Sequence, residues 1–213
     1  MPFISRVKRM SWMLSLFSRI VVAEPTLRYR LKHRARPVGG KRVVIPNRVS
    51  VSERPKEVDG VRFGDFEMDT IVGKGNCGAI VTLVEKQTNM LFMRKLKHGK
   101  NAKKLAETVK QLLMPFKGRI KTITTDNGLE FAAHEMISKS LAVPVYFAGP
   151  YSSWQKGAIE NANGLIRQYI PKAAAFSNFS QQKITKFMNE INERPRKKLN
   201  FSTPKECFYK NIL

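Results

Sequence analysis

Three acidic residues of this chain are spaced as metal-dependent nucleases space their ligands. Asp69 lies in the strand-like segment 66–72, Asp126 follows the segment 122–125, and Glu160 lies in a helical segment. Between Asp126 and Glu160 there are 33 residues (160 − 126 − 1). Two divalent cations held about 4 Å apart by carboxylates can activate an attacking oxygen and stabilise a leaving oxygen at phosphorus. Mg²⁺ suits such a site, because it takes few carboxylates and keeps waters and phosphates as its other ligands.

Each acid also has an ordinary structural interpretation. Asp65, Glu67 and Asp69 lie on one face of a strand by its two-residue period, so periodicity does not choose among them. Asp126 opens an Asp-Asn-Gly sequence, and Asn-Gly pairs favour positive φ in turns. Glu160 could be a first-turn acid favoured by the helix macrodipole. Taken together with the element order and the charge, the three acids favour a metal site.

The charge of the chain favours a nucleic-acid partner. The 213 residues include 39 Lys and Arg against 16 Asp and Glu, a net charge of +23. Basic side chains that neutralise phosphates release counterions, which drives binding. No apolar run reaches the length of a membrane span, so we expect no membrane partner. With 42% hydrophobic residues, the chain suits one domain of ordinary size plus an extension.

Cysteine and histidine indicate neither a disulfide scaffold nor a zinc site. Cys77 and Cys207 are far apart, and the three histidines are scattered with no metal-binding spacing. Two distant cysteines fit a reducing compartment. We therefore expect a cytoplasmic protein.

The N-terminal part is interpreted as a basic, poorly structured arm over residues 1–57, followed by a folded domain over residues 58–213. Its first twenty-odd residues faintly resemble a secretory signal, but a chain this basic and poor in cysteine gives little reason for export. Residues 28–48 are rich in Lys and Arg, and they form either a DNA tether or a solvated linker. The candidate DNA contacts in the arm are Arg34, Arg36, Lys41 and Arg42.

Hydrophobic periodicity predicts the elements that must position the acids. The pattern predicts an α/β fold, a mixed five-stranded sheet with helices on both faces. This is the element order of the ribonuclease H-like fold, and it places Asp126 at the carboxyl end of a strand, where sites form in open sheets. The predicted strands are 63–72, 79–84, 90–96, 120–124 and 143–147, and the predicted helices are 102–113 with Asn101 as its N-cap, 132–141, 158–169 and one capped by Ser180.

Several polar and aromatic residues near Glu160 are further candidates for DNA contact. Arg167 lies two helical turns after Glu160 on the same face, where it could hold a phosphate or form a surface ion pair. Asn161 and Asn163 flank the acid. The segment that precedes the helix contains Tyr151, Trp154 and Lys156. Its side chains could stack on bases or form a packed loop corner, and the sequence does not choose between the two.

The motifs around these residues resemble a known family. Residues 46–208, about three quarters of the chain, are similar to the integrase-type catalytic core of insertion-sequence transposases of the IS-thirty family. The segments that carry the resemblance are Asn47-Arg48-Val49-Ser50, Glu53-Arg54-Pro55, Gly64-Asp65-Phe66-Glu67-Met68-Asp69-Thr70, Thr122-Ile123-Thr124-Thr125-Asp126-Asn127-Gly128, Glu130-Phe131-Ala132, Pro150-Tyr151, Trp154, Gly157, Glu160-Asn161, Asn163-Gly164-Leu165-Ile166-Arg167, Asn192, Arg194-Pro195-Arg196-Lys197 and Thr203-Pro204.

The resemblance implies an Asp-Asp-Glu transposase that cuts and transfers DNA strands with Mg²⁺ (or Mn²⁺), with two ions expected. It selects Asp69 as the first ligand, beside Asp126 and Glu160. The implied partner is double-stranded DNA, both element ends and target, with self-association on DNA and no small-molecule substrate. The implied location is the nucleoid of a bacterium.

The sequence departs from the family pattern in three places. Ile159 stands where the family commonly has Asn, and Ala173-Ala174-Ala175 where it commonly has Gly-Thr-Asp. Residues 1–60 contain no recognisable helix-turn-helix, so we expect an N-terminally shortened copy. The alternative functions are a catalytically incompetent DNA-binding remnant and a plain RNA- or DNA-binding protein without a metal site.

Overall fold

The computed structural model describes residues 45–57, 60–96, 99, 101–149 and 153–213, without the side chains of Ser153 and Trp154. The chain divides into two units, Met1–Arg42 and Val43–Leu213, and the fold described below is that of the second. Arg34, Arg36, Lys41 and Arg42, the predicted DNA contacts of the arm, lie outside the described residues, as does Tyr151.

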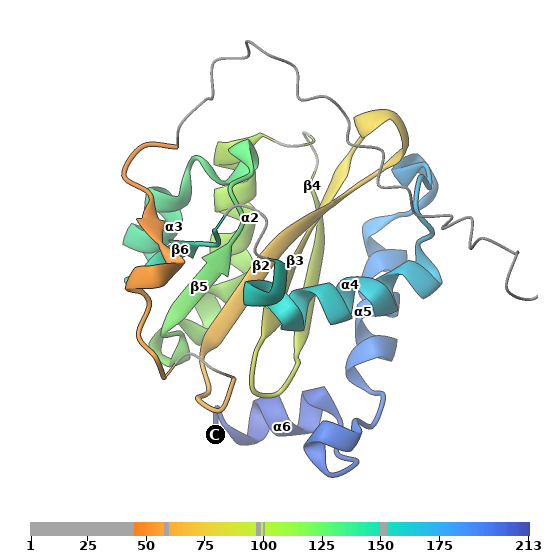
Figure 1. Cartoon of the computed structure of the whole chain (residues 1–213). Coiled ribbons are helices and arrows are strands. Elements are labelled where there is room, and N and C mark those ends of the chain that lie inside the picture. The colour runs from red at the N-terminus through yellow and green to blue at the C-terminus, as the bar shows by residue number, and fades with distance from the viewer. Residues whose placement is uncertain (1–44, 58–59, 97–98, 100, 150–152) are drawn as a thin grey trace, which may run out of the picture. The chain divides into compact units, whose positions relative to one another are not determined.

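A mixed sheet forms the centre of this unit (Figure 1). Its strand order is β1-β6-β5-β2-β3-β4, with antiparallel pairing of β2 with β3 and of β3 with β4, and parallel pairing elsewhere. Five strands match the predicted ones, and the short β1 adds a sixth at the edge beside β6. The strands are β1 (Val49–Ser50), β2 (Asp65–Val72), β3 (Ala79–Glu85), β4 (Leu91–Leu96), β5 (Thr122–Thr125) and β6 (Val145–Phe147).

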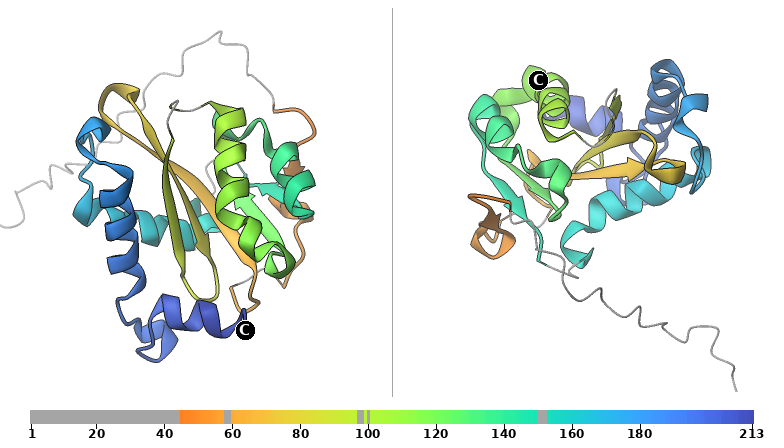
Figure 2. Two further views of the ribbon diagram at one scale, coloured as in Figure 1. Left: turned by 180° about the vertical axis from the view of Figure 1, so that it is seen from behind. Right: turned by 90° about the horizontal axis from the view of Figure 1, so that it is seen from above.

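Helices cover both faces of the sheet, as the two opposite views show (Figures 1 and 2). One face carries α2 and α3, and the other carries α4 and α5. The helices are α2 (Ala102–Leu113), α3 (His134–Leu141), α4 (Gly157–Tyr169), α5 (Gln181–Asn192) and α6 (Pro204–Lys210). None of the helices in the described ranges is long and apolar enough to cross a membrane.

Capping residues begin three of the helices. The side chain of Asn101 accepts a hydrogen bond from the amide of Lys104, and that of Ser180 accepts one from Lys183, as the sequence predicted. Thr203 begins α6 with a capping box, in which Glu206 bonds back to the Thr203 amide. Helix α6 was not predicted, although Thr203-Pro204-Lys205-Glu206 carries a capping box with proline at the first helical position.

Two buried clusters hold the layers together, because alternate side chains of each strand point to opposite faces. In β2, Phe66 and Met68 pack with α2 and α3, whereas Ile71 packs with α4 and α5. The buried face of α4 consists of Ile159, Ala162 and Ile166. Burial of this face fixes the rotation of α4, so its exposed side is directed outward beside β2.

Polar side chains of α5 form hydrogen bonds with backbone groups of β4, the last strand of the sheet. Asn192 is 1% exposed, and its amide accepts from the Leu91 N–H at 2.9 Å and donates to the Leu91 carbonyl at 2.8 Å. Gln181 accepts from the Lys95 N–H at 2.9 Å. Unpaired strand edges are exposed to wrong pairing, and α5 closes this one with side chains.

Candidate active site

Asp69 and Asp126 lie side by side because β2 and β5 run parallel in a defined register. Glu67 is paired with Thr124, so two residues further along each strand bring Asp69 level with Asp126. β5 ends at Thr125, and β2 continues to Val72. Asp126 therefore stands at the carboxyl end of its strand, next to an acid from the middle of the neighbouring strand.

The three acids of β2 have different environments. Asp65 is fully buried, where it accepts hydrogen bonds from Arg62 at 2.9 and 3.0 Å and from Thr122 at 2.7 Å. Glu67 is 1% exposed and accepts the Ile159 N–H at 2.9 Å. Both acids are thus occupied in structural contacts, whereas the Asp69 side chain is 21% exposed beside Asp126.

Several groups hold the Asp69 carboxylate in place. Its Oδ1 accepts the Thr70 N–H at 2.8 Å, and its Oδ2 accepts the side-chain amide of Asn163 at 2.9 Å. Burial raises the pKa of Asp69, Lys156 lowers it, and the neighbouring Asp126 raises it further. Desolvation and a like charge both disfavour the ionised form, so this site concentrates negative charge that a cation would neutralise.

The loop after Asp126 holds that carboxylate through Gly128. The Gly128 N–H donates to Asp126 Oδ1 at 2.9 Å. A Cβ built at Gly128 would lie 2.7 Å from Glu130 Oε2 and 3.0 Å from Asp126 Oδ1. Gly128 has φ −66°, so the glycine is required by this close approach and not by a positive φ.

Lys156 places its ammonium between the two aspartates. Its Nζ is 3.3 Å from Asp126 Oδ2 and 3.9 Å from Asp69 Oδ1, and the residue is 7% exposed. We expected Lys156 to contact DNA, but its ammonium is directed at the two acids. Local sequence does not indicate this contact, since the helix α3 and the strand β6 lie between Asp126 and Lys156 along the chain.

Glu160 lies in the first turn of α4, and its residue is exposed. Lys156 precedes it by four residues and Asn163 follows it by three, and both contact Asp69. Residues three and four apart share a helix face, so Glu160 lies on the face of α4 that is turned to the two aspartates. Its carboxylate has no hydrogen bond or ion pair with any described residue, and no three described His, Cys, Asp or Glu side chains form a ready metal cluster.

The other predicted DNA contacts lie in different surroundings, and not all of them are near the two aspartates. Asn163 bonds to Asp69, whereas Asn161 is exposed beside a pocket on another side of α4. Arg167 is half-buried, and its guanidinium donates weakly to the Pro171 carbonyl at 3.4 Å. The backbone of Trp154 belongs to the short helix Ser153–Lys156.

Two residues near the acids were not predicted as site residues. Glu130 is 9% exposed and accepts the Thr70 hydroxyl at 2.7 Å, which ties the loop after Asp126 to the strand of Asp69. Arg48 donates to the side-chain oxygen of Asn127, the neighbour of Asp126. Both residues occur in the family segments, but their own neighbours in sequence give no indication of these contacts.

The side chains present fit a hard divalent cation. Carboxylate oxygens from Asp69 and Asp126 converge, with Glu160 on the adjacent helix face, and Mg²⁺ prefers such ligands. The Lys156 ammonium already occupies a position between the two carboxylates as a positive charge.

The sheet and its helices define the class of this protein: it has the ribonuclease H-like α/β fold of integrase-type catalytic cores, as predicted. The fold matches the catalytic core domain of BIV integrase with a TM-score of 0.55, over 70% of this chain and 95% of that chain, at 18% sequence identity. No protein-family model matches the chain.

Sequence similarity connects the chain to particular transposases. It is 48% identical over 165 residues to the transposase for insertion sequence element IS4351 of Bacteroides fragilis, covering 77% of this chain and 50% of that protein. It is 36% identical over 190 residues to transposase InsI for element IS30C of Escherichia coli K12, covering 88% of this chain and 49% of that protein. The chain is therefore related to the insertion-sequence transposases that include those of IS30, as its motifs predicted, and it spans about half the length of these relatives.

Proposed function

We propose that this chain carries the catalytic core of an insertion-sequence transposase, which cuts DNA strands at element ends and joins them to target DNA. The observation that carries the proposal is the pairing of Asp69 with Asp126 across parallel strands, beside a helix that presents Glu160. Relatives named as transposases, at 36 to 48% identity, support the same function.

In this proposal Asp69, Asp126 and Glu160 bind two Mg²⁺ (or Mn²⁺) ions. Bound divalent cations supply a polarised attacking oxygen and a stabilised leaving oxygen at phosphorus. Asp69 is oriented by the Asn163 amide and the Thr70 N–H, and Asp126 by the Gly128 N–H. These fixed contacts keep both carboxylates in place before DNA arrives, which lowers the reorganisation needed for reaction.

DNA would approach from the exposed side of α4. Arg167 lies two turns after Glu160 and is a candidate to hold a phosphate. Arg48, beside Asn127, adds a second positive charge near Asp126. The proposal includes element ends and target DNA as the two DNA partners, and self-association of the chain when it is bound to DNA.

The test is metal-dependent cleavage and joining of DNA by the full chain and three variants. Asp69→Asn, Asp126→Asn and Glu160→Gln are each expected to lower the rate by at least about a thousandfold, since an amide cannot neutralise a hard cation. Glu107→Gln on α2 removes a comparable exposed carboxylate far from the site and should leave the rate unchanged.

Full activity of any of the three variants would remove that residue from the site. Metal binding by the wild-type chain without cleavage of any duplex would instead favour a DNA-binding remnant.

A further inference from the structure

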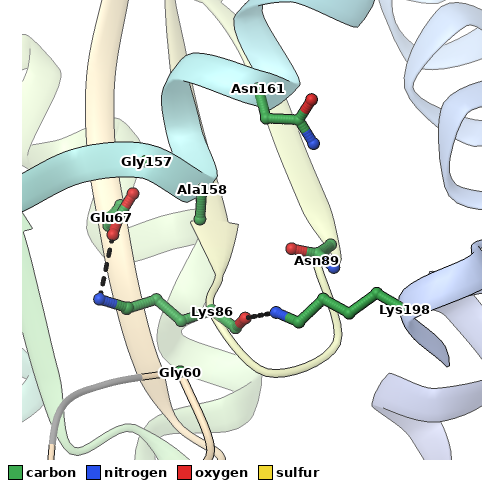
Figure 3. Close-up of a pocket in the computed structure, with 8 residues that line it drawn as sticks. All are labelled: Gly60, Glu67, Lys86, Asn89, Gly157, Ala158, Asn161 and Lys198. Carbon is green, nitrogen blue, oxygen red and sulfur yellow. Dashed lines mark hydrogen bonds and ion pairs between the residues drawn. The ribbon is translucent and has the colours of Figure 1, made fainter. Parts of the chain in front are cut away.

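A polar pocket of about 370 Å³ opens beside α4, away from the three acids. Segments that are distant in sequence form its walls: the loop before β2, the turn between β3 and β4, the first turn of α4, and the short helix Lys197–Leu199 that follows α5 (Figure 3). Its lining residues include Glu67, Lys86, Asn89, Asn161 and Lys198.

The floor of the pocket is a buried ion pair. Lys86 Nζ lies 3.2 Å from Glu67 Oε1, and the two side chains are 12% and 1% exposed. The other oxygen of Glu67 accepts the Ile159 N–H of α4 at 2.9 Å. The pair neutralises its own charge and fixes α4 against the strands, so the floor is rigid and contributes little net charge.

The rim of the pocket offers hydrogen-bond donors. Lys198 is exposed and donates to the Lys86 carbonyl at 3.1 Å, and an ammonium has three donors. The side-chain amides of Asn89 and Asn161 make no hydrogen bond to a described residue, and both extend toward the pocket in the close-up (Figure 3). These groups would suit an oxygen-rich anion.

Positive charge continues from Lys198 along the same loop. Arg196 has a buried Nε atom without a hydrogen-bond partner, and burial together with the nearby Arg194 lowers its pKa. Lys197 adds another exposed cation. Neither Arg196 nor Lys197 lines the pocket, but their charges next to Lys198 add to the positive potential that an anion there would meet.

The pocket is close to the proposed reaction centre because both use the first turn of α4. Asn161 faces the pocket, and its neighbour Glu160 lies on the face turned to the aspartates. An α-helix with its side chains is about 10 Å wide. A DNA strand bound at the acids can therefore cross α4 and place a nearby backbone phosphate at the pocket.

Resting on the proposed function, we propose that the pocket lined by Lys198, Asn161 and Asn89 binds a backbone phosphate of the DNA held at the acidic site. Contacts of this kind set the position of a duplex without reading its sequence. The pocket then fixes the angle at which the strand crosses α4, and so which phosphodiester reaches Asp69 and Asp126.

The test measures duplex binding by the full chain at several salt concentrations, with a chelator present so that metal binding plays no part. Loss of one phosphate contact lowers the slope of log affinity against log salt by about 0.9. Lys198→Ala should show this loss. Lys103→Ala, which removes an exposed lysine from α2 on the opposite face of the sheet, should keep the wild-type slope.

A second variant tests the pocket without removing a positive charge. Asn161→Asp should weaken duplex binding at least about tenfold, because it sets a like charge against the phosphate. Asn189→Asp, an exposed position on α5, controls for the added charge.

The outcomes separate this proposal from the proposed function. If wild-type protein cuts DNA but Lys198→Ala and Asn161→Asp behave like their controls, the pocket proposal alone is wrong. If wild-type protein neither binds nor cuts DNA, both proposals are wrong.

Discussion

Asp69 is a carboxylate that the fold holds partly out of water beside a second acid. Burial and Asp126 raise its pKa, and only Lys156 and two hydrogen bonds oppose them. A raised folded-state pKa means that the folded chain binds this proton more tightly than the unfolded chain. In the metal-free protein, the stability contributed by this group therefore falls as pH rises from the ordinary aspartate pKa, about 3.9, through the raised value.

Asp69→Asn is accordingly expected to raise the melting temperature of metal-free protein at neutral pH. The gain should vanish below pH about 3.9, where the wild-type carboxylate is protonated in both states. Melting curves with a chelator, recorded across this pH range, measure the effect. Saturating Mg²⁺ should make the wild type melt at a higher temperature than the variant, since a ligand at 100 times its Kd stabilises the protein that binds it by about 2.7 kcal/mol. A variant less stable than the wild type at neutral pH without metal would contradict the raised pKa of Asp69.

Gly128 determines where the Asp126 carboxylate can lie. An added Cβ would contact both Glu130 and Asp126, and Glu130 is bonded to Thr70. Gly128→Ala is therefore expected to weaken Mg²⁺ binding about tenfold or more and to destabilise the fold by about 1–3 kcal/mol. Calorimetric titration with Mg²⁺ and denaturant unfolding measure the two effects.

Gly164 provides a matched control on the helix of Glu160. A Cβ built there meets no atom within 4 Å. Gly164→Ala should leave Mg²⁺ binding unchanged and stabilise the helix by up to about 1 kcal/mol. Equal Mg²⁺ affinities for the two variants would show that Gly128 does not position Asp126.

Among the elements, β4 depends on α5 for hydrogen-bond partners to the backbone groups on its outer edge. Asn192 supplies both an acceptor and a donor to Leu91. Asn192→Ala would leave two buried backbone groups without partners, so we expect a loss of about 2–4 kcal/mol in the free energy of unfolding. Denaturant titration measures it. Asn189→Ala removes an exposed amide of the same helix and should cost less than about 1 kcal/mol; equal losses would assign the effect to helix propensity.

The helix α4 links the candidate site to the core. Its buried residues pack under the sheet face, while Lys156, just before it, and Asn163 reach the two aspartates. The Glu67 carboxylate fixes its first turn through the Ile159 N–H. A shift of α4 would therefore displace Glu160 and the contacts of Asp69 together.

At the scale of the whole molecule, the net charge of +23 dominates long-range interaction with DNA. Non-specific binding should weaken steeply with salt, by about a thousandfold between 50 and 200 mM if at least six phosphates are contacted. Titration of a terminal-repeat duplex and a scrambled duplex at several salt concentrations measures this loss. We expect little preference between them, because no helix-turn-helix was recognised in residues 1–60. A large preference that persists at high salt would require a recognition element that the motifs do not reveal.

Local pattern was sufficient to predict most of the secondary structure. The apolar spacing of residues 102–113 predicted α2, and Asn101 was identified as its cap. The family motifs likewise indicated the integrase-type fold. The edge strand β1 was missed because two residues leave no periodicity, and α6 was missed although its capping box was present.

The sequence by itself determined which segments form strands and helices and which acids are candidates, because periodicity and capping depend on neighbours along the chain. Periodicity left Asp65, Glu67 and Asp69 equivalent, since all three share one strand face, and only the family motif selected Asp69. The tertiary structure supplies the physical difference: Asp65 bonds to Arg62 and Thr122, Glu67 to Lys86 and α4, and Asp69 faces Asp126. Such contacts depend on strand register and helix packing between segments far apart in sequence, which no local pattern of residues records.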